Sequence, residues 1–256
     1  MNFKLNALVA AALLVAAGSA NAAIGNGSTG NGELFFNIWD ANGSYTRDLN
    51  VTIDAFQTAL SAGGDIDLSW TADNTFASYL AGVADTSALK WNIMADDGVG
   101  ARRLLTTFTA PKPSVTKTND VIRSAVGGVD LFIGSVNGVI GANDSVAVNS
   151  GSAAWAGQVG FGSTLNNKLN FSSAGTLANN SYASGLGFMR IDALATGILP
   201  SVYNPYMDGT VTVNAYLDAG NALHLAAAPV PEADTYALML AGLGLVGFMA
   251  RRRLSV

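Results

Sequence analysis

The 256-residue chain has no cysteine, a single histidine (His224) and only 12 % charged residues. Without cysteine there can be no disulfide bond, no thiol nucleophile and no thiolate metal site. One histidine cannot supply the several imidazole ligands of a His-based zinc site. If the chain is exported, its stability must therefore come from its core, from bound ions or from self-association.

Positive charge is also scarce in the main part of the chain. Subtracting Lys4 and Arg251–Arg253 from the 13 basic residues leaves 9, and subtracting Glu232 and Asp234 from the 18 acidic residues leaves 16. The net charge between the two ends is therefore near −7. Because proteins bind nucleic acid chiefly through positive charge, we expect no nucleic-acid partner.

The first segment, residues 1–22, has the order of a secretory signal peptide. A lysine precedes an 11-residue apolar core at 7–17, and the small residues Ala20 and Ala22 mark a cleavage site. This pattern predicts an N-terminal signal helix that is removed, so that the mature chain begins at Ala23. The protein is then expected to be exported.

The last segment, residues 229–256, has the order of a sorting signal joined to an anchor. A short polar stretch precedes 15 uncharged residues at 236–250, at the short end of the roughly 17–25 that span a bilayer. We expect one transmembrane helix there, leaving 23–228 as an exported domain. Because basic clusters stay on the cytoplasmic side, the membrane stop is formed by Arg251, Arg252 and Arg253.

This tail resembles the PEP-CTERM sorting signal of Gram-negative bacteria. Pro231 and Glu232 match its short motif, and the helix and arginines follow in order, although Ala233 stands where the signal usually has proline. The resemblance implies an exosortase, a membrane transpeptidase-like enzyme, as partner, and removal of the tail. It also implies a producer of exopolysaccharide and a mature product in the cell envelope or matrix. It covers about 28 of the 256 residues and brings no activity for 23–228.

The exported domain is predicted to be mainly β. Alternation of apolar and polar residues predicts strands, and Asn42-Gly43 predicts a hairpin turn between the first two. Apolar residues at spacings of three and four predict helices after Asp73 and over 119–140. These elements favour a β-sandwich-like domain with a few helical insertions. The expected strands are 33–40, 45–54, 65–70, 88–95, 102–110, 185–194, 210–217 and 222–226.

No catalytic constellation stands out, and we expect no enzyme, no cofactor and no metal ion. His224 alternates with leucines in the last strand, which is typical of a solvated or packed residue. Asp65 and Asp67 share one strand face, but acidic residues there are usually solvated. The loop after Asp40 offers alternating oxygen ligands but lacks the glycine and glutamate positions of an EF-hand. Four tryptophans could stack on a sugar: Trp39, Trp70, Trp91 and Trp155. The first three lie in strand patterns typical of core packing, so Trp155, in a Gly/Asn/Ser-rich stretch, is the candidate sugar contact.

Three hypotheses follow for the function of the exported domain. The first is a structural or adhesive protein linked to exopolysaccharide or biofilm. The second is a carbohydrate-binding module, assisted or not by calcium. The third, least favoured, is a hydrolase acting on the polysaccharide. In each, the membrane anchors the protein transiently through its tail, with the main domain periplasmic, before tail processing releases it to the envelope or outside the cell.

Overall fold

The computed structural model describes residues 23–62, 66–100, 102–194, 197–208 and 211–227. Three α-helices and three short 3-10 helices accompany the strands: η1 (Gly27–Thr29), α2 (Ile53–Ser61), α3 (Asn74–Ala81), η2 (Thr86–Ala88), α4 (Asn119–Ile140) and η3 (Tyr182–Ser184). The strands are β1 (Glu33–Trp39), β2 (Gly43–Thr52), β3 (Asp67–Trp70), β4 (Lys90–Asp97), β5 (Arg103–Phe108), β6 (Ser145–Asn149), β7 (Leu186–Asp192), β8 (Val202–Pro205), β9 (Met207–Asp208), β10 (Val211–Thr212), β11 (Asn214–Leu217) and β12 (Leu223–Ala226).

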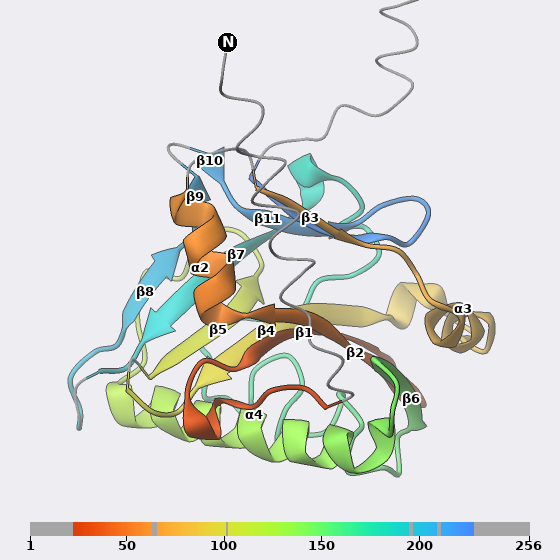
Figure 1. The fold of residues 1–256 in the computed structure, drawn as a ribbon, viewed down its shortest axis with the longest axis horizontal. Coiled ribbons are helices and arrows are strands. Elements are labelled where there is room, and N and C mark those ends of the chain that lie inside the picture. The colour runs from red at the N-terminus through yellow and green to blue at the C-terminus, as the bar shows by residue number, and fades with distance from the viewer. Residues whose placement is uncertain (1–22, 63–65, 101, 195–196, 209–210, 228–256) are drawn as a thin grey trace, which may run out of the picture.

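Nine of the strands form one continuous path in the order β3-β12-β11-β7-β5-β4-β1-β2-β6, with β8 paired beside β7. The strand pairs are antiparallel. The sheet curls into a half-barrel, with α4 lying across one side of it (Figure 1). A second sheet is the two-stranded ribbon β9-β10.

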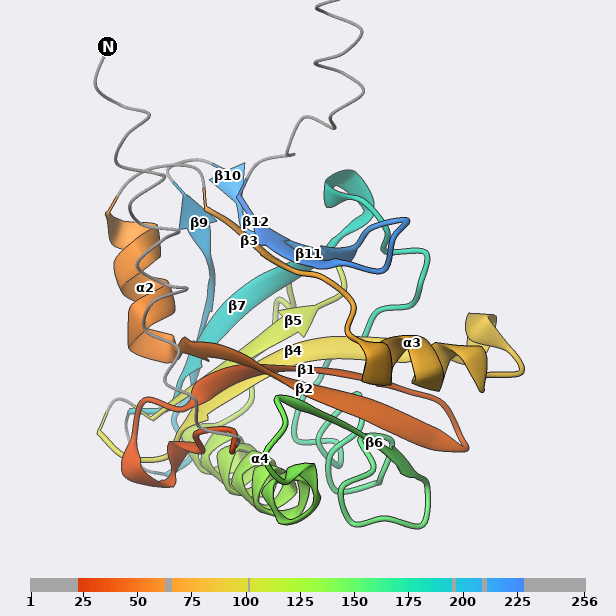
Figure 2. The ribbon, with the colours of Figure 1, turned by 45° about the vertical axis from the view of Figure 1, so that its right-hand side comes forward.

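Two hydrophobic cores lie on opposite faces of the sheet. One fills the inside of the curl, where Phe36, Trp91 and Phe188 meet residues of α2, α3 and β12. The other packs Phe35 and Met94 against α4 and the long segment that follows β6. Figure 2 shows α4 on one side of the strands and α2 and α3 on the other. Burial on both faces explains why β1 has aromatic side chains pointing both ways.

Local sequence signals are confirmed where they are strongest. The amphipathic stripe predicts 119–140, and α4 spans those residues with its apolar face buried. The Asn42-Gly43 turn joins β1 and β2 as an antiparallel hairpin. Asp73 is the N-cap of α3, because its Oδ1 accepts the Phe76 N–H at 2.7 Å. Of the strand predicted over 210–217, residues 214–217 form β11 and pair with β12 as expected, whereas Val211 and Thr212 form β10, which pairs with β9 in the second sheet.

The predicted mainly β class with a few helices is confirmed, but the two facing sheets of a sandwich are replaced by one curled sheet. Alternation along a strand reports which face is buried, and an inward-curling sheet buries a face much as a second sheet would. The strand predicted over 45–54 also ends early. Thr52 caps α2, its hydroxyl accepting the Ala55 N–H at 3.2 Å, so Ile53 begins a helix.

Candidate functional site

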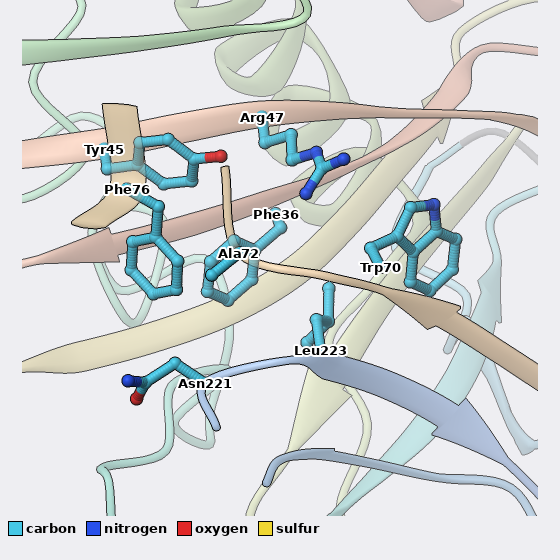
Figure 3. Close-up of a pocket in the computed structure, with 8 residues that line it drawn as sticks. All are labelled: Phe36, Tyr45, Arg47, Trp70, Ala72, Phe76, Asn221 and Leu223. Atoms are coloured by element: carbon cyan, nitrogen blue, oxygen red, sulfur yellow. The ribbon is translucent and has the colours of Figure 1, made fainter. Parts of the chain in front are cut away.

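The candidate site is a cleft at the seam where β3, at one end of the curled sheet, approaches β2 near the other end (Figure 3). Two hydrogen bonds cross the seam between β2 and the β3 region. Arg47 Nη1 donates to the Thr71 carbonyl at 2.6 Å, and Trp70 Nε1 donates to the Leu49 carbonyl at 3.1 Å. The cleft is lined by Phe36, Tyr45, Arg47, Trp70, Ala72, Phe76, Asn221 and Leu223.

Three packed aromatic rings form the inner wall of the cleft. Tyr45 stacks on Phe76 with ring centroids 4.8 Å apart, and Phe36 meets Phe76 edge-on at 5.9 Å. The Tyr45 hydroxyl donates to Asp73 Oδ2 at 2.8 Å. Burial, reinforced by Asp73, raises the pKa of Tyr45 far above its ordinary value, so this hydroxyl stays protonated. The wall is thus fixed in place rather than reactive.

Asp73 links the cleft to α3. Burial acts to raise its pKa, but the hydrogen bonds it accepts from the Phe76 amide and the Tyr45 hydroxyl outweigh burial, and its pKa is lowered. The ionised carboxylate therefore holds the helix start and the tyrosine together. One side chain positions two parts of the cleft.

Arg47 is the cation of the cleft, and it lies on the apolar face of β2, where sequence alternation predicts a hydrophobic residue. Figure 3 shows its guanidinium reaching into the space between Tyr45 and Trp70. Its Nε is buried and has no hydrogen-bond partner among the described residues. The outer N–H groups of a guanidinium beside a half-buried indole can bind a hydroxyl or anionic group.

The cleft is small: its cavity volume is about 10 Å³, roughly room for one water molecule. A ligand would therefore contact the outer rim, where Trp70 and Asn221 are half-buried. An aromatic face beside amide and guanidinium donors can stack on a sugar ring and hydrogen-bond its hydroxyls. The geometry suits a surface contact with a polymer better than enclosure of a small molecule.

His224 lies on β12 and is held between two acids. Its Nε2 is 3.2 Å from Asp218 Oδ2, its Nδ1 is 3.9 Å from Asp67 Oδ1, and its ring stacks on Tyr216 at 4.7 Å. Asp67, together with Asp218, raises the pKa of His224 despite partial burial. This arrangement favours the charged imidazolium rather than a general base.

The other sequence-predicted residues lie apart from the cleft. Trp155 is half-buried, and its Nε1 donates to the carbonyls of Asp40 and Gly43, both at 3.2 Å. The loop after Asp40 bonds to itself, because Asp40 Oδ1 accepts the N–H groups of Asn42 and Gly43, each at 2.9 Å. Asp65 lies outside the described residues.

The predicted cleavage residues Ala20 and Ala22, the motif residues Pro231 and Glu232, the helix 236–250 and the arginines 251–253 also lie outside the described residues. No helix in the described ranges has the length and hydropathy needed to cross a membrane. Nor do three or more Asp, Glu or His side chains gather into a metal-binding group in that part of the chain.

The cleft cannot be derived from sequence patterns, although one signal for it is present in the sequence. Arg47 interrupts the apolar face of an otherwise regular strand, and the structure places that residue at the seam. Nothing in the sequence brings β3 and β12 to the same place, because their pairing joins residues more than 150 positions apart.

The family comparison identifies the tail. Residues 229–253 match the PEP-CTERM protein-sorting motif. No curated protein and no solved structure matches the chain. The motif implies an exported, envelope-associated protein that is processed by an exosortase.

Proposed function

From the sorting motif at 229–253 we propose that this protein is a non-enzymatic component of the cell envelope or extracellular matrix. It would reach the periplasm through its signal peptide, remain in the inner membrane through 236–250, and leave after the exosortase removes the tail. In the envelope or matrix it would have a structural or adhesive role linked to exopolysaccharide or biofilm. The motif itself is the observation that carries this proposal.

The test is the intact mass of the protein from culture fluid and from membranes, in strains with and without the exosortase. We expect a secreted form that begins at Ala23 and ends near Pro231, present only when the exosortase is present. Glu232→Ala should leave the full tail attached and the protein in the membrane. Ala233→Pro, which restores the usual motif residue, is the matched variant and should be processed at least as well as the native chain.

A full-length, membrane-bound form in both strains would refute the sorting step, and the tail would then act as a lasting anchor. A processed protein that is absent from the matrix fraction would instead refute the matrix role. The two outcomes separate where the protein goes from what it does there.

A second candidate function is binding of carbohydrate at the cleft, and the half-buried Trp70 beside the Arg47 guanidinium favours it. We expect native protein to be retained on the producer's exopolysaccharide and Arg47→Gln to lose at least about tenfold in affinity, the effect of about 1.4 kcal/mol from one charge-assisted contact. Trp155→Ala is the comparison variant. Loss on Trp155→Ala with none on Arg47→Gln would move the contact to the tryptophan that the sequence indicates.

The hydrolase hypothesis is tested in the same material. Release of new reducing ends from the polysaccharide by native protein, abolished by Asp67→Asn, would replace both proposals with an enzyme. Retention on the polysaccharide without release of reducing ends supports the binding module. If the protein is neither retained nor releases reducing ends, the purely structural role is supported.

A further inference from the structure

Two carboxyl groups face each other between the sheet and α4. Asp96 comes from β4 and Asp130 comes from α4, and both carboxyls lie against the backbone contact between Gly27 and Gly98. Asp96 is 0 % exposed. Both carboxyl oxygens of Asp96 and Oδ1 of Asp130 are buried and accept no hydrogen bond of good geometry from the described residues. Burial raises the pKa of Asp96, and the Gly27 amide is close enough to oppose that rise.

The neighbouring charges do not relieve this pair. Asp97, the next residue, uses its carboxylate on Arg103, whose Nη2 lies 2.8 Å from Asp97 Oδ2. Within the described ranges no arginine, lysine or histidine forms an ion pair with Asp96 or Asp130. A buried carboxylate without a partner costs several kcal/mol, since even a neutral polar group costs roughly 1–3.

The start of the exported domain covers the pair. The Gly98 N–H donates to the Gly27 carbonyl at 2.8 Å, and the Gly32 N–H donates to the Asp96 carbonyl at 3.2 Å. A Cβ at Gly27 would collide with the Asp96 carboxylate, and a Cβ at Gly98 would lie 3.6 Å from Asp130 Oδ2. Glycine at position 27 therefore lets the main chain approach Asp96 closely, and a Cβ at Gly98 would also lie 3.3 Å from the Gly27 carbonyl.

We propose that Asp96 and Asp130 bind a calcium ion, which ties the segment from Ile24 to Glu33 to β4 and α4. Calcium takes 6–8 oxygen ligands, from carboxylates, main-chain carbonyls and water. The two acids supply up to four of them, and main-chain carbonyl groups of the covering segment would supply the rest. The divalent charge also offsets the mutual repulsion of the acids.

Calcium fits the chemistry better than the alternatives among cations. Magnesium keeps several waters in a strict octahedron, which the fully buried Asp96 does not favour. Zinc and copper prefer nitrogen and sulfur ligands. An exported protein also meets calcium at concentrations that fill sites with dissociation constants of about 0.1–1 mM. A bound calcium ion would stabilise this cysteine-free domain as disulfides stabilise other exported proteins. The proposal replaces the expectation that the protein binds no metal ion.

The test uses the full chain in mild detergent, stripped with EGTA and then titrated with calcium chloride or magnesium chloride. At ten times its dissociation constant, calcium should raise the Tm by about 3–6 °C. Asp96→Asn and Asp130→Asn should each reduce that gain to less than about 1 °C. Asp85→Asn is the matched control, because it removes a carboxylate that is exposed and keeps a side chain able to cap η2.

Amide hydrogen exchange provides a second readout that a general salt effect would not reproduce. Calcium should slow exchange at Gly32 and Gly98 in the native chain and in Asp85→Asn, but not in the Asp96 or Asp130 variants. The proposal is overturned if calcium leaves the native Tm unchanged, or if both pair variants keep the full gain. It is also overturned if magnesium raises the Tm as much as calcium does at equal concentration. The same holds if Asp96→Asn raises the Tm while calcium leaves the native Tm unchanged, because that result identifies two carboxyls that share a proton.

Discussion

Asp48 offers a quantitative test of the electrostatics of this fold. Its side chain is buried on β2, where Oδ1 accepts the Asn50 N–H at 2.8 Å and Oδ2 has no partner among the described residues. Burial, with smaller contributions from Glu33 and Asp144, raises the pKa of Asp48 from 3.8 to about 7. Asp48→Asn keeps the acceptor for Asn50 and removes the charge.

The size of the effect follows from the pKa. In the unfolded chain Asp48 ionises above its ordinary pKa of 3.8, whereas the folded chain holds the proton up to about pH 7. At about 1.4 kcal/mol per tenfold change in the acid constant, this difference destabilises the fold by about 4 kcal/mol at pH 8. The raised pKa means that this loss grows as the pH rises from about 4 to 7 and is constant above that range.

The amide introduced by Asp48→Asn would leave its own N–H donors without a partner, at a cost of about 2 kcal/mol. We therefore expect Asp48→Asn to raise the free energy of unfolding by about 2 kcal/mol at pH 8, or about 4–8 °C in Tm. At pH 5 the electrostatic penalty is only about 1.6 kcal/mol, so the gain should fall to about zero.

Urea denaturation at both pH values, followed by tryptophan fluorescence, measures the difference. Asp85→Asn, at an exposed position, should change the stability by no more than about 0.5 kcal/mol at either pH. An equal gain at pH 5 and pH 8 would show that packing rather than ionisation is responsible. A loss of stability at pH 8 would refute the reasoning about Asp48.

Three further predictions test other parts of the molecule. The raised pKa of His224 means that its charge stabilises the fold fully below pH 6.5 and that this contribution is lost as the pH rises through the raised value. In thermal melts, His224→Gln should therefore lower the Tm at pH 6 and have little effect on it at pH 9. Phe161 is buried, and its ring centroid lies 3.8 Å from that of Phe132 on α4. Phe161→Ala should therefore lower the free energy of unfolding, measured by urea denaturation, by about 3–5 kcal/mol, and Phe161→Leu should lower it much less. Equal losses of stability in the two variants would contradict this account of the packing. Asp73→Ala should cost about 1–2 kcal/mol through the lost helix cap, whereas Asp73→Asn, which keeps an acceptor for the cap, should cost less than half as much in the same assay.

Much of the secondary structure is predictable because its causes are local. The stripe over 119–140, the Asn42-Gly43 turn and the Asp73 cap each depend on residues within one or two turns of chain. The start of α2 was missed, since the alternation of β2 continues into Ile53. A usable signal was present: Thr52 can cap a helix, and Phe56 follows Ile53 at helical spacing.

The sites could not be predicted in the same way. Arg47 and Leu223 line one cleft although 176 positions separate them, and Asp96 and Asp130 meet across the sheet and α4 although 34 positions separate them. Sequence patterns report which residue types face inward, but not which of them become neighbours. Asp65 and Asp67 stand out in the sequence because alternation predicts that they share one strand face, whereas the buried pair joins two separate elements.

The sequence by itself determined the sorting of the protein. The sorting motif at 229–253 is a linear signal, and the order of a lysine, an apolar core at 7–17 and small residues predicts a second one at the other end. Only the tertiary structure decided that the strands form one curled sheet. It also decided which charged side chains lack partners where the sheet curls and where it packs against α4. The physical reason is that a linear signal depends on order along the chain, whereas burial and charge pairing depend on distances that only folding sets.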